Sequence, residues 1–549
     1  MAVSAGTAPE DIMMRVHALL YLLTMGSLIP TAPPPAQDGD GVARADAIVA
    51  EWVAAERVPG AVLLIARDGD VLFEKAYGQA QLYGYDEGQY GASAAGEHRA
   101  DALRRLPDAV PMRANTVFDL ASLTKVMATT FAVMLLVDDG RIDLNAPVQR
   151  YLPDFGAPAA LGTPSSRAAG SEFAAATPAG NTAKATITVR QLLTHRSGLS
   201  QWQPIYYAAE NADAAYRFIR DFPLGWQPGT ERHYSDLGFM LLGMLVERVS
   251  GTGLGELLHE RLYGPLGLTA TRFRPDSPRP GAFAATSHGN PFEHRMVHDP
   301  DFGYRIDIDP DSWDGWRRHT LVGEVNDGNA FHAFGGEAGH AGLFSTAREL
   351  QVLVQLVLNR GEYGGRRYLS AAVVDRFLAP TGDGQALGWQ VPDHLPAGSF
   401  QHTGFTGTYV AGLPAAGTAI VLLINRQNVG VNDEGQYPDV GELQRGVTRA
   451  VLETGRPADS KDATARGSNQ LSYEPVRGEA PDLVKRSRLL EQMRGPRHDL
   501  DARRHAHARP SLDRASRTNP EGSVGFPPTA LSALFRFCAG ARHRSVESL

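Results

Sequence analysis

The apolar and polar positions of this chain fall into segments with either helical or strand-like periodicity. Residues 43–55 have the apolar spacing of a helix. Two β-rich runs follow at 61–66 and 71–77, and the Asp68-Gly69 pair between them is a strong hairpin signal. The first ordered part of the chain is therefore predicted to be a helix followed by a β-hairpin.

Two long apolar segments in the middle of the chain predict buried helices. Residues 120–139 are apolar around nearly the whole helical circumference, which is typical of a helix inside a core. Residues 237–249 form a second apolar helix, which Gly251 is placed to end. Residues 187–195 are expected to be ordered between them.

The last periodic segments predict strands. Residues 402–413 and 418–425 alternate or run apolar with glycine turns between them, which indicates two antiparallel strands. Residues 440–452 predict a closing helix. Strands at both ends of the chain with helices between them imply one antiparallel sheet, built from both chain ends and packed by the helices. The predicted fold class is therefore α+β, with a mostly helical region inserted.

Three segments lack a clear period. Residues 79–112 are polar and rich in glycine and alanine, and residues 155–184 are a low-complexity run of small residues and proline, so two loop insertions are expected. Residues 456–549 are rich in arginine, proline, glycine and serine, which predicts a disordered or loosely attached tail. One domain is expected over residues 37–455.

The N-terminus has the pattern of a secretory signal. Residues 18–29 are apolar, follow Arg15 and precede a proline-rich stretch. This run is shorter than the ~20 residues that span a bilayer. We expect residues 1–36 to be a signal or N-terminal anchor and the protein to be periplasmic or secreted, with membrane contact only through this segment if it is not cleaved. A short N-terminal helix is the alternative interpretation.

Charge and cysteine content narrow the function classes. The chain of 549 residues has a net charge of −8, with 17 Lys and Arg against 11 Asp and Glu in residues 456–549. An acidic body, and a basic tail with few aromatic residues, argue against nucleic-acid binding. The single cysteine, Cys538, excludes an intrachain disulfide and a cysteine-rich zinc site. No His-Glu-x-x-His pattern occurs, so no metal or other cofactor is expected.

The most informative short motif is Ser122-Leu123-Thr124-Lys125. On a helix, positions i and i+3 share a face, so the hydroxyl of Ser122 and the amine of Lys125 can approach each other. A serine hydroxyl is a poor nucleophile until a base takes its proton, and a lysine that loses its charge by desolvation can act as that base. A plain pair of helix residues is the alternative.

The surrounding sequence resembles the superfamily of β-lactamases, penicillin-binding proteins and related esterases, in its class C-like branch. Residues 118–125 look like the first motif of that family. Tyr-Ser-Asp at 234–236 stands where the family has Tyr-x-Asn, and His-Thr-Gly at 402–404 where it has Lys-Thr-Gly or His-x-Gly. The order and spacing of the motifs agree with the family, and the resemblance covers roughly residues 45–455.

The resemblance implies a role for each matching residue. Ser122 would attack a carbonyl, Lys125 would take or relay its proton, and Tyr234 would pass a proton to the leaving group or activate the deacylating water. That role requires Tyr234 to have a depressed pKa or to share a proton with Lys125. The backbone N–H groups of Ser122 and Phe405 would form the oxyanion hole. The substrate-binding positions would be Asp236, His402, Thr403, Gly404 and Phe405.

Two departures from the family pattern bear on the substrate. Asp236 replaces the usual amide and, when ionised, cannot donate an N–H to a substrate carbonyl, although it can hold Lys125 in place or charged. His402 replaces the lysine that grips a substrate carboxylate, and a histidine is largely neutral near pH 7 unless it is perturbed. Both changes argue against efficient penicillin hydrolysis.

The predicted reaction is acyl transfer to water on a small molecule or a peptidoglycan-derived substrate. An ester, a D-amino-acid amide, a peptide of the kind that D-alanyl-D-alanine carboxypeptidases cleave, and weakly a β-lactam fit the resemblance. A catalytically silent module that binds cell-wall peptides is the alternative. A Ser-His-Asp triad of His195 or His340 with Ser197 or Ser345 is disfavoured, because neither serine lies in a Gly-x-Ser-x-Gly elbow.

Overall fold

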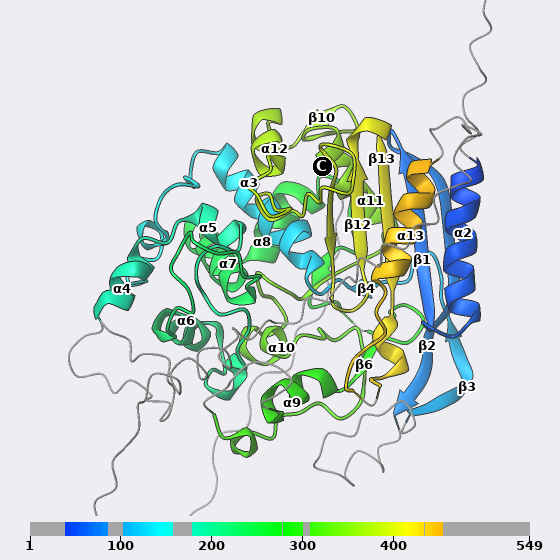
Figure 1. Ribbon diagram of the computed structural model, residues 1–549, viewed down its shortest axis with the longest axis horizontal. Helices are drawn as coiled ribbons and strands as arrows, with labels where there is room; N and C mark the ends of the chain where they lie inside the picture. Colours follow the sequence, from blue (N-terminus) through cyan, green and yellow to red (C-terminus); the bar gives the residue numbers. More distant parts are fainter. Residues whose placement is uncertain are drawn as a thin grey trace, which may run out of the picture. The chain divides into compact units, whose positions relative to one another are not determined.

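The computed structural model describes residues 39–85, 103–156, 178–276, 278–299, 308–432 and 434–453 (Figure 1). The predicted signal segment and the predicted tail lie outside the described residues. A six-stranded antiparallel sheet has the order β11-β12-β13-β1-β2-β3. Its strands are β1 Gly60–Arg67, β2 Asp70–Tyr85, β3 Leu103–Pro111, β11 Phe400–Thr403, β12 Tyr409–Leu413 and β13 Thr418–Ile424.

The centre of this sheet joins the two ends of the described chain. β1 pairs with β13 from Ala61 opposite Ile424 to Arg67 opposite Thr418. β1 is buried along nearly its whole length, so its sequence is a continuous apolar run. The predicted antiparallel sheet built from both chain ends, and with it the α+β fold class, is confirmed.

The predicted hairpin between β1 and β2 is also confirmed. Asp68 and Gly69 have φ angles of 50° and 95°, which is the left-handed conformation that a tight hairpin turn requires. Helices cover both faces of the sheet. α2 Gly39–Ala54 and α13 Gly441–Leu452 pack side by side on one face, and α11 Ala347–Leu358 lies on the other (Figure 1).

A mostly helical region packs beside the sheet (Figure 1). Its central helix starts as a π-helix, η2 Lys125–Thr130, and continues as α3 Phe131–Asp138; all but the last two residues are buried. The other helices of this region are α4 Pro178–Ala185, α5 Val189–Leu193, α6 Ala212–Asp221, α7 Asp236–Ser250, α8 Leu254–Leu258, η5 His259–Tyr263, α9 Pro291–His298, α10 Gly328–Phe334 and α12 Ala371–Leu378. α7 ends at Gly251 in the left-handed conformation, as predicted.

Short elements complete the described chain. The remaining strands are β4 Phe118–Asp119, β5 Arg272–Phe273, β6 Ala285–His288, β7 Thr320–Val322, β8 Leu343–Ser345, β9 Glu362–Tyr363 and β10 Arg366–Arg367. Single 3-10 turns occur at η3 Val148–Arg150, η4 Ile205–Tyr207, η6 Pro310–Ser312, η7 Pro414–Ala416 and η8 Arg426–Val429.

The predicted loop insertion at 79–112 is wrong at both ends. β2 continues to Tyr85, and β3 begins at Leu103 and pairs with β2. Along β2, residues such as Ala80 and Gly84 are buried while their neighbours are less so. Because Ala80 and Gly84 take two of the three inward positions here and only Leu82 is large, the alternation of hydropathy that marks a strand is weak in the sequence.

The second predicted insertion, 155–184, also extends too far. Phe155 is fully buried, and α4 begins at Pro178. The buried Lys184 donates to backbone carbonyls at and beyond the C-terminal end of α6, which anchors the end of α4. The low-complexity composition of this segment hid a helix that is held by one long side chain.

The predicted single strand over 402–413 is in fact two. β11 and β12 form an antiparallel hairpin, and the turn between them contains Gly404 and Gly407, the latter at a φ of 111°. Only a residue without a side chain adopts that φ readily, so the chain reverses here. This turn carries Phe405 and becomes part of the site described below.

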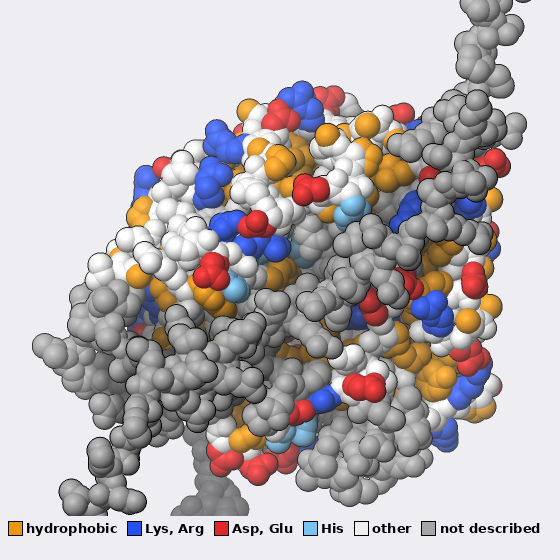
Figure 2. Space-filling view, viewed as in Figure 1, with side chains coloured by type: hydrophobic (Ala, Val, Ile, Leu, Met, Phe, Trp, Pro, Cys, Tyr) orange, Lys and Arg blue, Asp and Glu red, His pale blue; other side chains and the backbone are white. Residues whose placement is uncertain are grey.

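Membrane-spanning potential is limited in the described residues. No single helix among them is long and apolar enough to cross a bilayer, and α7 followed by α8 and η5 meets that criterion only as a pair bent by 69°. On the face seen in Figure 2, acidic and basic side chains are interspersed over the described surface.

Candidate active site

The site is built around a strained turn that ends in Ser122. Ala121 has a φ of 44°, which is unfavourable for a residue with a side chain. The buried carboxylate of Asp119 compensates, because its Oδ1 accepts the Ala121 N–H at 2.8 Å and its Oδ2 accepts the Asn326 N–H at 2.6 Å. Burial raises the pKa of Asp119 to about 6, against the lowering effect of these two bonds. Ser122 therefore stands at a fixed position before the first helical turn.

Lys125 lies under Ser122, one helical turn along. Its side chain is fully buried, and its Nζ is 3.0 Å from the Oγ of Ser122. The same Nζ is 2.7 Å from Oδ1 of Asp236 and donates to the His340 backbone carbonyl at 3.1 Å. An ammonium group has three donors and no acceptor, so these three oxygens suit the charged form.

The electrostatics of the site keep Lys125 charged. Burial by itself lowers the pKa of Lys125, but the opposite charge of Asp236 and the oxygen of Tyr234 outweigh it, and the pKa is raised above the ordinary lysine value. The sequence-based expectation that desolvation would remove the charge of Lys125 is wrong. It failed because the carboxylate that pairs with Lys125 is distant in the sequence, on the first residue of α7.

Tyr234 closes the other side of Ser122. Its hydroxyl interacts with Ser122 and Lys125, and its ring centre is 5.0 Å from the Nζ of Lys125. Burial raises the pKa of Tyr234, and Asp236 adds to the rise, whereas Lys125 opposes it. The expected depressed pKa is therefore wrong, and the alternative role, a proton shared with Lys125, stays a prediction.

The loop that carries Tyr234 is fixed by α7 and by a buried histidine. Ser235 caps α7 by accepting the Gly238 N–H at 3.1 Å. The Nδ1 of His195 accepts the Ser235 N–H at 3.0 Å, and the His195 ring lies 4.4 Å from the Tyr234 ring. The chain thus turns so that Tyr234 and Asp236 both reach Lys125.

His402 is a neutral neighbour of this group. Its Nδ1 donates to the Thr403 carbonyl at 2.8 Å, so Nε2 is the unprotonated nitrogen. Burial, with the charge of Lys125, lowers the pKa of His402 to about 3. The ring lies 6.3 Å from that of Tyr234. β11 therefore presents a neutral side chain at residue 402.

The turn after His402 packs directly on the backbone before Ser122. A Cβ at Gly404 would lie 2.3 Å from the Leu120 carbonyl oxygen, so only glycine fits. The hydroxyl of Thr406 donates to the Asp119 carbonyl at 2.8 Å, and that of Thr408 donates to the Leu120 carbonyl at 3.0 Å. These contacts fix the backbone around Phe405 against the backbone that precedes Ser122.

The two predicted oxyanion donors are Ser122 N–H and Phe405 N–H. Neither donates to another residue in the described part of the chain, although the amides of Ala121, Leu123 and Gly404 do. Free, fixed amides beside a nucleophile can stabilise a developing oxyanion. The Phe405 ring is 37% exposed and contacts the rings of Phe292 and Tyr437, at 5.0 and 5.8 Å between centres.

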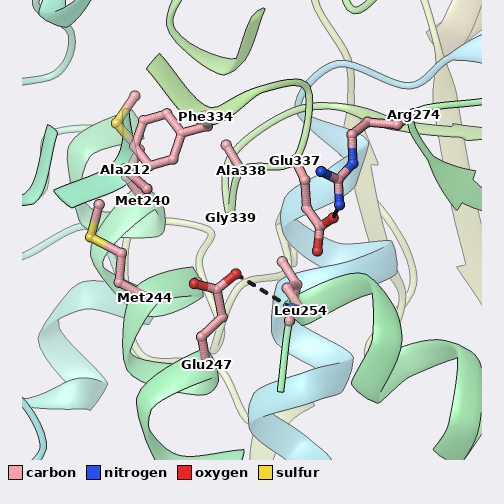
Figure 3. Close-up of a pocket in the computed structure, with 12 residues that line it drawn as sticks. Ala212, Met240, Met244, Glu247, Leu254, Arg274, Phe334, Glu337, Ala338 and Gly339 are labelled. Atoms are coloured by element: carbon pink, nitrogen blue, oxygen red, sulfur yellow. Dashed lines mark hydrogen bonds and ion pairs between the residues drawn. The ribbon is translucent and has the colours of Figure 1, made fainter. Parts of the chain in front are cut away.

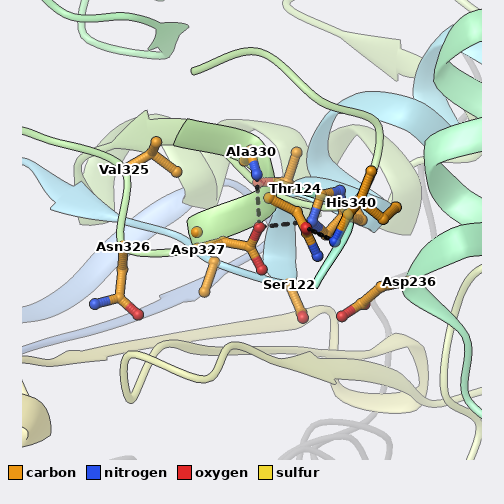
Figure 4. A network of polar contacts seen from close by, with 12 residues as sticks. Ser122, Thr124, Asp236, Val325, Asn326, Asp327, Ala330 and His340 are labelled. Carbon is orange, nitrogen blue, oxygen red and sulfur yellow. Dashed lines mark hydrogen bonds and ion pairs between the residues drawn. The ribbon is translucent and has the colours of Figure 1, made fainter. Parts of the chain in front are cut away.

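Sequence reasoning missed the support under Lys125. The carbonyl of His340 accepts from Lys125, and the His340 Nε2 is 2.9 Å from Oδ1 of Asp327, which also caps α10 (Figure 4). Sequence reasoning also missed the role of Asp119. The sequence offered only general signals for these two carboxylates: Asp119 lies three residues before Ser122, and Asp327 precedes a helix as an N-cap does.

The alternative histidine triads do not form. Ser197 Oγ accepts the Leu199 N–H, and Ser345 Oγ bonds with the Thr271 hydroxyl. Within the described ranges, no hydrogen bond joins either serine to His195 or His340. In the same ranges, no three His, Cys, Asp or Glu side chains are grouped so that they could hold a metal ion.

A separate cavity of about 180 Å³ lies behind α7 (Figure 3). Glu247 accepts from Leu254 on one side of it, and Arg274 pairs with Glu337 on the other. None of the predicted site residues lines this cavity. It adjoins the site only through Gly339, the residue before His340, so it is not the place where a substrate would meet Ser122.

Comparison with known proteins gives the family context. The sequence profile of the family described as Beta-lactamase matches residues 45–444. The chain is 32% identical over 405 residues to an N-acetylmuramyl-L-alanine amidase of Bacillus subtilis (strain 168), covering 70% of this chain and 81% of that protein. It is also 30% identical over 406 residues to a protein of Escherichia coli (strain K12) whose name gives an inferred function, D-alanyl-D-alanine carboxypeptidase. That match covers 70% of this chain and 82% of the relative.

Solved structures agree in fold. A penicillin-binding protein homologue from Caulobacter crescentus superposes with a TM-score of 0.52 at 19% identity, covering 76% of this chain and 98% of that one. A family VIII carboxylesterase superposes with a TM-score of 0.52 at 18% identity, covering 75% and 97%. At these identities the likeness supports the fold alone.

Proposed function

Because this chain belongs to the Beta-lactamase family of serine hydrolases, we propose that it cleaves an amide bond of a peptidoglycan-derived peptide through an acyl-enzyme at Ser122. The observation that carries the proposal is the Ser122, Lys125 and Tyr234 group, in which one hydroxyl meets an ammonium at 3.0 Å and a phenol. The names of two relatives, an amidase and a carboxypeptidase, support an amide of the cell wall as the substrate.

The charge states of the site suggest how the proton moves. With Lys125 charged and Tyr234 neutral, Ser122 attacks the carbonyl as its proton passes to the Tyr234 oxygen, and Tyr234 gives its own proton to the leaving nitrogen. Lys125 stabilises the negative charge that develops on these oxygens. The Ser122 and Phe405 N–H groups receive the carbonyl oxygen as it becomes an oxyanion.

Deacylation follows by the same path in reverse. A water molecule attacks the ester carbonyl while its proton passes to Tyr234, and Tyr234 returns a proton to the Ser122 oxygen as the ester bond breaks. The products are the free acid and the regenerated hydroxyl, so each step balances without a metal ion. Asp236 remains the partner of Lys125 in both steps.

The neutral His402 limits the range of substrates. A buried imidazole with a pKa of about 3 makes no ion pair with a carboxylate at neutral pH, so β11 supplies no cation for a penicillin carboxylate. We therefore expect slow β-lactam hydrolysis and turnover of simple esters as a side activity. A catalytically silent module that binds wall peptides is the second candidate. Such a module would not need the free N–H groups of Ser122 and Phe405.

The proposed location is outside the cytoplasm. The signal pattern in residues 1–36 and the cell-wall names of the relatives support export to the periplasm or the medium. Peptidoglycan stem peptides are the substrates available there.

Muropeptide digestion tests the proposal. Purified protein is incubated with defined muropeptides, and the products are identified by mass spectrometry. Release of D-alanine, or of the peptide from the sugar, is expected with wild type and with Ser197→Ala, and not with Ser122→Ala. A folded wild type that gives no product and forms no covalent adduct with a serine-directed reagent would favour the silent binding module instead.

A further inference from the structure

Arg317 is a buried arginine to which the proposed mechanism gives no role. Its Nη1 donates to the Val325 carbonyl and its Nη2 to the Asn326 carbonyl, each at 2.6 Å. Its Nε donates to Oδ1 of Asn290 at 3.0 Å, and Asn290 in turn donates to the same Asn326 carbonyl at 2.8 Å. A single guanidinium therefore holds the backbone of residues 325–327, called the 325–327 segment below.

The 325–327 segment supports the turn before Ser122. The Asn326 N–H donates to Oδ2 of Asp119 at 2.6 Å, and Oδ1 of Asp119 accepts the Ala121 N–H at 2.8 Å. Ala121 has a φ of 44°, which a residue with a side chain keeps only where its surroundings hold it there. A displacement of Asn326 would therefore release the residue next to Ser122.

The same segment supports Lys125 through its last residue. Oδ1 of Asp327 is 2.9 Å from Nε2 of the buried His340, whose backbone carbonyl accepts from Lys125 at 3.1 Å (Figure 4). Oδ1 of Asp327 also accepts the Ala330 N–H at 2.7 Å, so the carboxylate is fixed by α10 as well. Movement of the segment is thereby passed to the ammonium group under Ser122.

Arg317 is also the cation that acts on both of these carboxylates. Burial raises the pKa of Asp119 to about 6, the charge of Asp327 adds to the rise, and the charge of Arg317 opposes it. The other carboxyl groups whose charge acts on Arg317 are Glu293 and Glu324. Burial and the charge of Asp327 raise the pKa of Glu293, so it resists ionisation, and Glu324 is partly exposed. Loss of Arg317 would therefore leave two buried carboxylates without their shared counter-charge.

We propose that Arg317 is a positioning residue for the acylation step, because it fixes the 325–327 segment and thereby holds Ser122 and Lys125 in register with each other. The support reaches Ser122 through one carboxylate and Lys125 through another. This inference rests on the proposed function, because it concerns the attack by Ser122.

Hydrolysis of the neutral ester 4-nitrophenyl acetate tests the role, with each rate divided by the number of sites that a fluorophosphonate titrates. Arg317→Met keeps the length of the side chain and removes its donors, and we expect kcat per titrated site to fall about 10- to 100-fold while KM stays within about threefold. Arg317→Lys keeps the charge without the fork of donors and is expected to lie between this variant and wild type. Arg318→Met, on the adjacent exposed arginine that pairs with Asp314, is the matched control and is expected to match wild type.

The acid side of the pH profile separates positioning from general damage. In wild type, kcat/KM for the neutral ester is expected to decline below about pH 6, because a protonated Asp119 accepts two backbone N–H groups less well. Arg317→Met removes a charge that lowers the pKa of Asp119, so its decline is expected to begin about 1 pH unit higher. Arg318→Met is expected to keep the wild-type profile, and Asp119→Asn is expected to be slow at every pH without this decline.

A second set of variants tests the shared segment with Arg317 in place. Asp119→Asn and Asp327→Asn each remove one of the two carboxylates, and the double variant removes both. Because both carboxylates are held by the 325–327 segment, the loss of kcat in the double variant is expected to be smaller than the product of the two single losses. This comparison decides the question even if Arg317→Met does not fold.

The possible failures are distinguishable. Wild-type kcat per titrated site in Arg317→Met, an unmoved acid decline in that variant, or an equal loss in Arg318→Met would refute the positioning role. Single losses that multiply in the double variant would refute it as well, and all of these results leave ester hydrolysis by wild type intact. Absence of ester hydrolysis in folded wild type that also resists a fluorophosphonate would refute the proposed function itself.

Discussion

Replacing Asp236 by asparagine should change the working pH range of the enzyme. The substitution keeps the size of the side chain and removes the charge 2.7 Å from the Nζ of Lys125. The Lys125 side chain is 0% exposed and that of Asp236 18%, so solvent screens this pair weakly. An opposite charge at such a distance shifts a pKa by about 1–3 units, or about 1.4–4 kcal/mol.

The sign follows from the raised pKa of Lys125. In wild type the ammonium persists well above neutral pH, and the activity that depends on it falls only in strongly alkaline solution. In Asp236→Asn, burial is no longer opposed by the carboxylate, so the proton leaves Lys125 at a pH about 1–3 units lower. We expect the alkaline limb of kcat/KM to move down by that amount.

The assay is the pH profile of neutral ester hydrolysis from pH 6 to 10.5, a range in which wild type is expected to show no alkaline limb and Asp236→Asn a decline toward the upper end. Asp375→Asn, which removes the partner of Arg360 in an exposed pair, is the control and is expected to leave the profile unchanged. The absence of any decline in Asp236→Asn over this range would contradict the reasoning. Activity that rises as Lys125 deprotonates would also contradict it, because an uncharged lysine would then be the base.

Two further predictions concern the frame of the site and its buried histidines. Gly404→Ala places a methyl group 2.3 Å from the Leu120 carbonyl oxygen, so the turn that carries Phe405 must shift. We expect kcat/KM for the neutral ester to fall about 100-fold, while circular dichroism shows that the fold is retained. Wild-type kinetics in this variant would contradict the prediction. His402 and His288 have pKa values lowered to about 3 and about 4 by burial, so the unfolded state binds protons that the folded state refuses below pH ~6.5. These two rings should therefore lower the free energy of unfolding as the pH drops from about 6.5 toward 4, by about 1.4 kcal/mol per pH unit for each histidine, whereas the raised pKa of Asp119 acts in the opposite direction. Urea unfolding of wild type and of His288→Gln at pH 7.0 and 5.5 isolates one ring: wild type is expected to lose more stability than the variant, and the same loss in both proteins would refute the reasoning.

Much of the fold follows from local pattern. The Asp68-Gly69 turn, the apolar runs of β1 and β13 and the all-apolar helix after Ser122 each carry a strong signal, and the structure has each of them. The extension of β2 was hidden because small residues take its inward positions. The β11–β12 hairpin was hidden because its reversal depends on Gly407, which is a single residue inside an otherwise strand-like run.

The candidate site, like the fold, could be predicted only in part from the sequence. Motif spacing identified Ser122, Lys125, Tyr234 and His402 as candidates, and the structure brings their side chains together. Their charge states could not be predicted, since the pKa of Lys125 depends on a carboxylate that only folding brings to 2.7 Å.

The central claim is that Ser122 is the acylated nucleophile. Intact-mass spectrometry after incubation with a fluorophosphonate, and separately with a labelled penicillin, tests it most directly. We expect one fluorophosphonate adduct on wild type and on Ser197→Ala and none on Ser122→Ala, with slow labelling by penicillin. An adduct that persists in Ser122→Ala, or a folded wild type that reacts with neither reagent, would contradict the account.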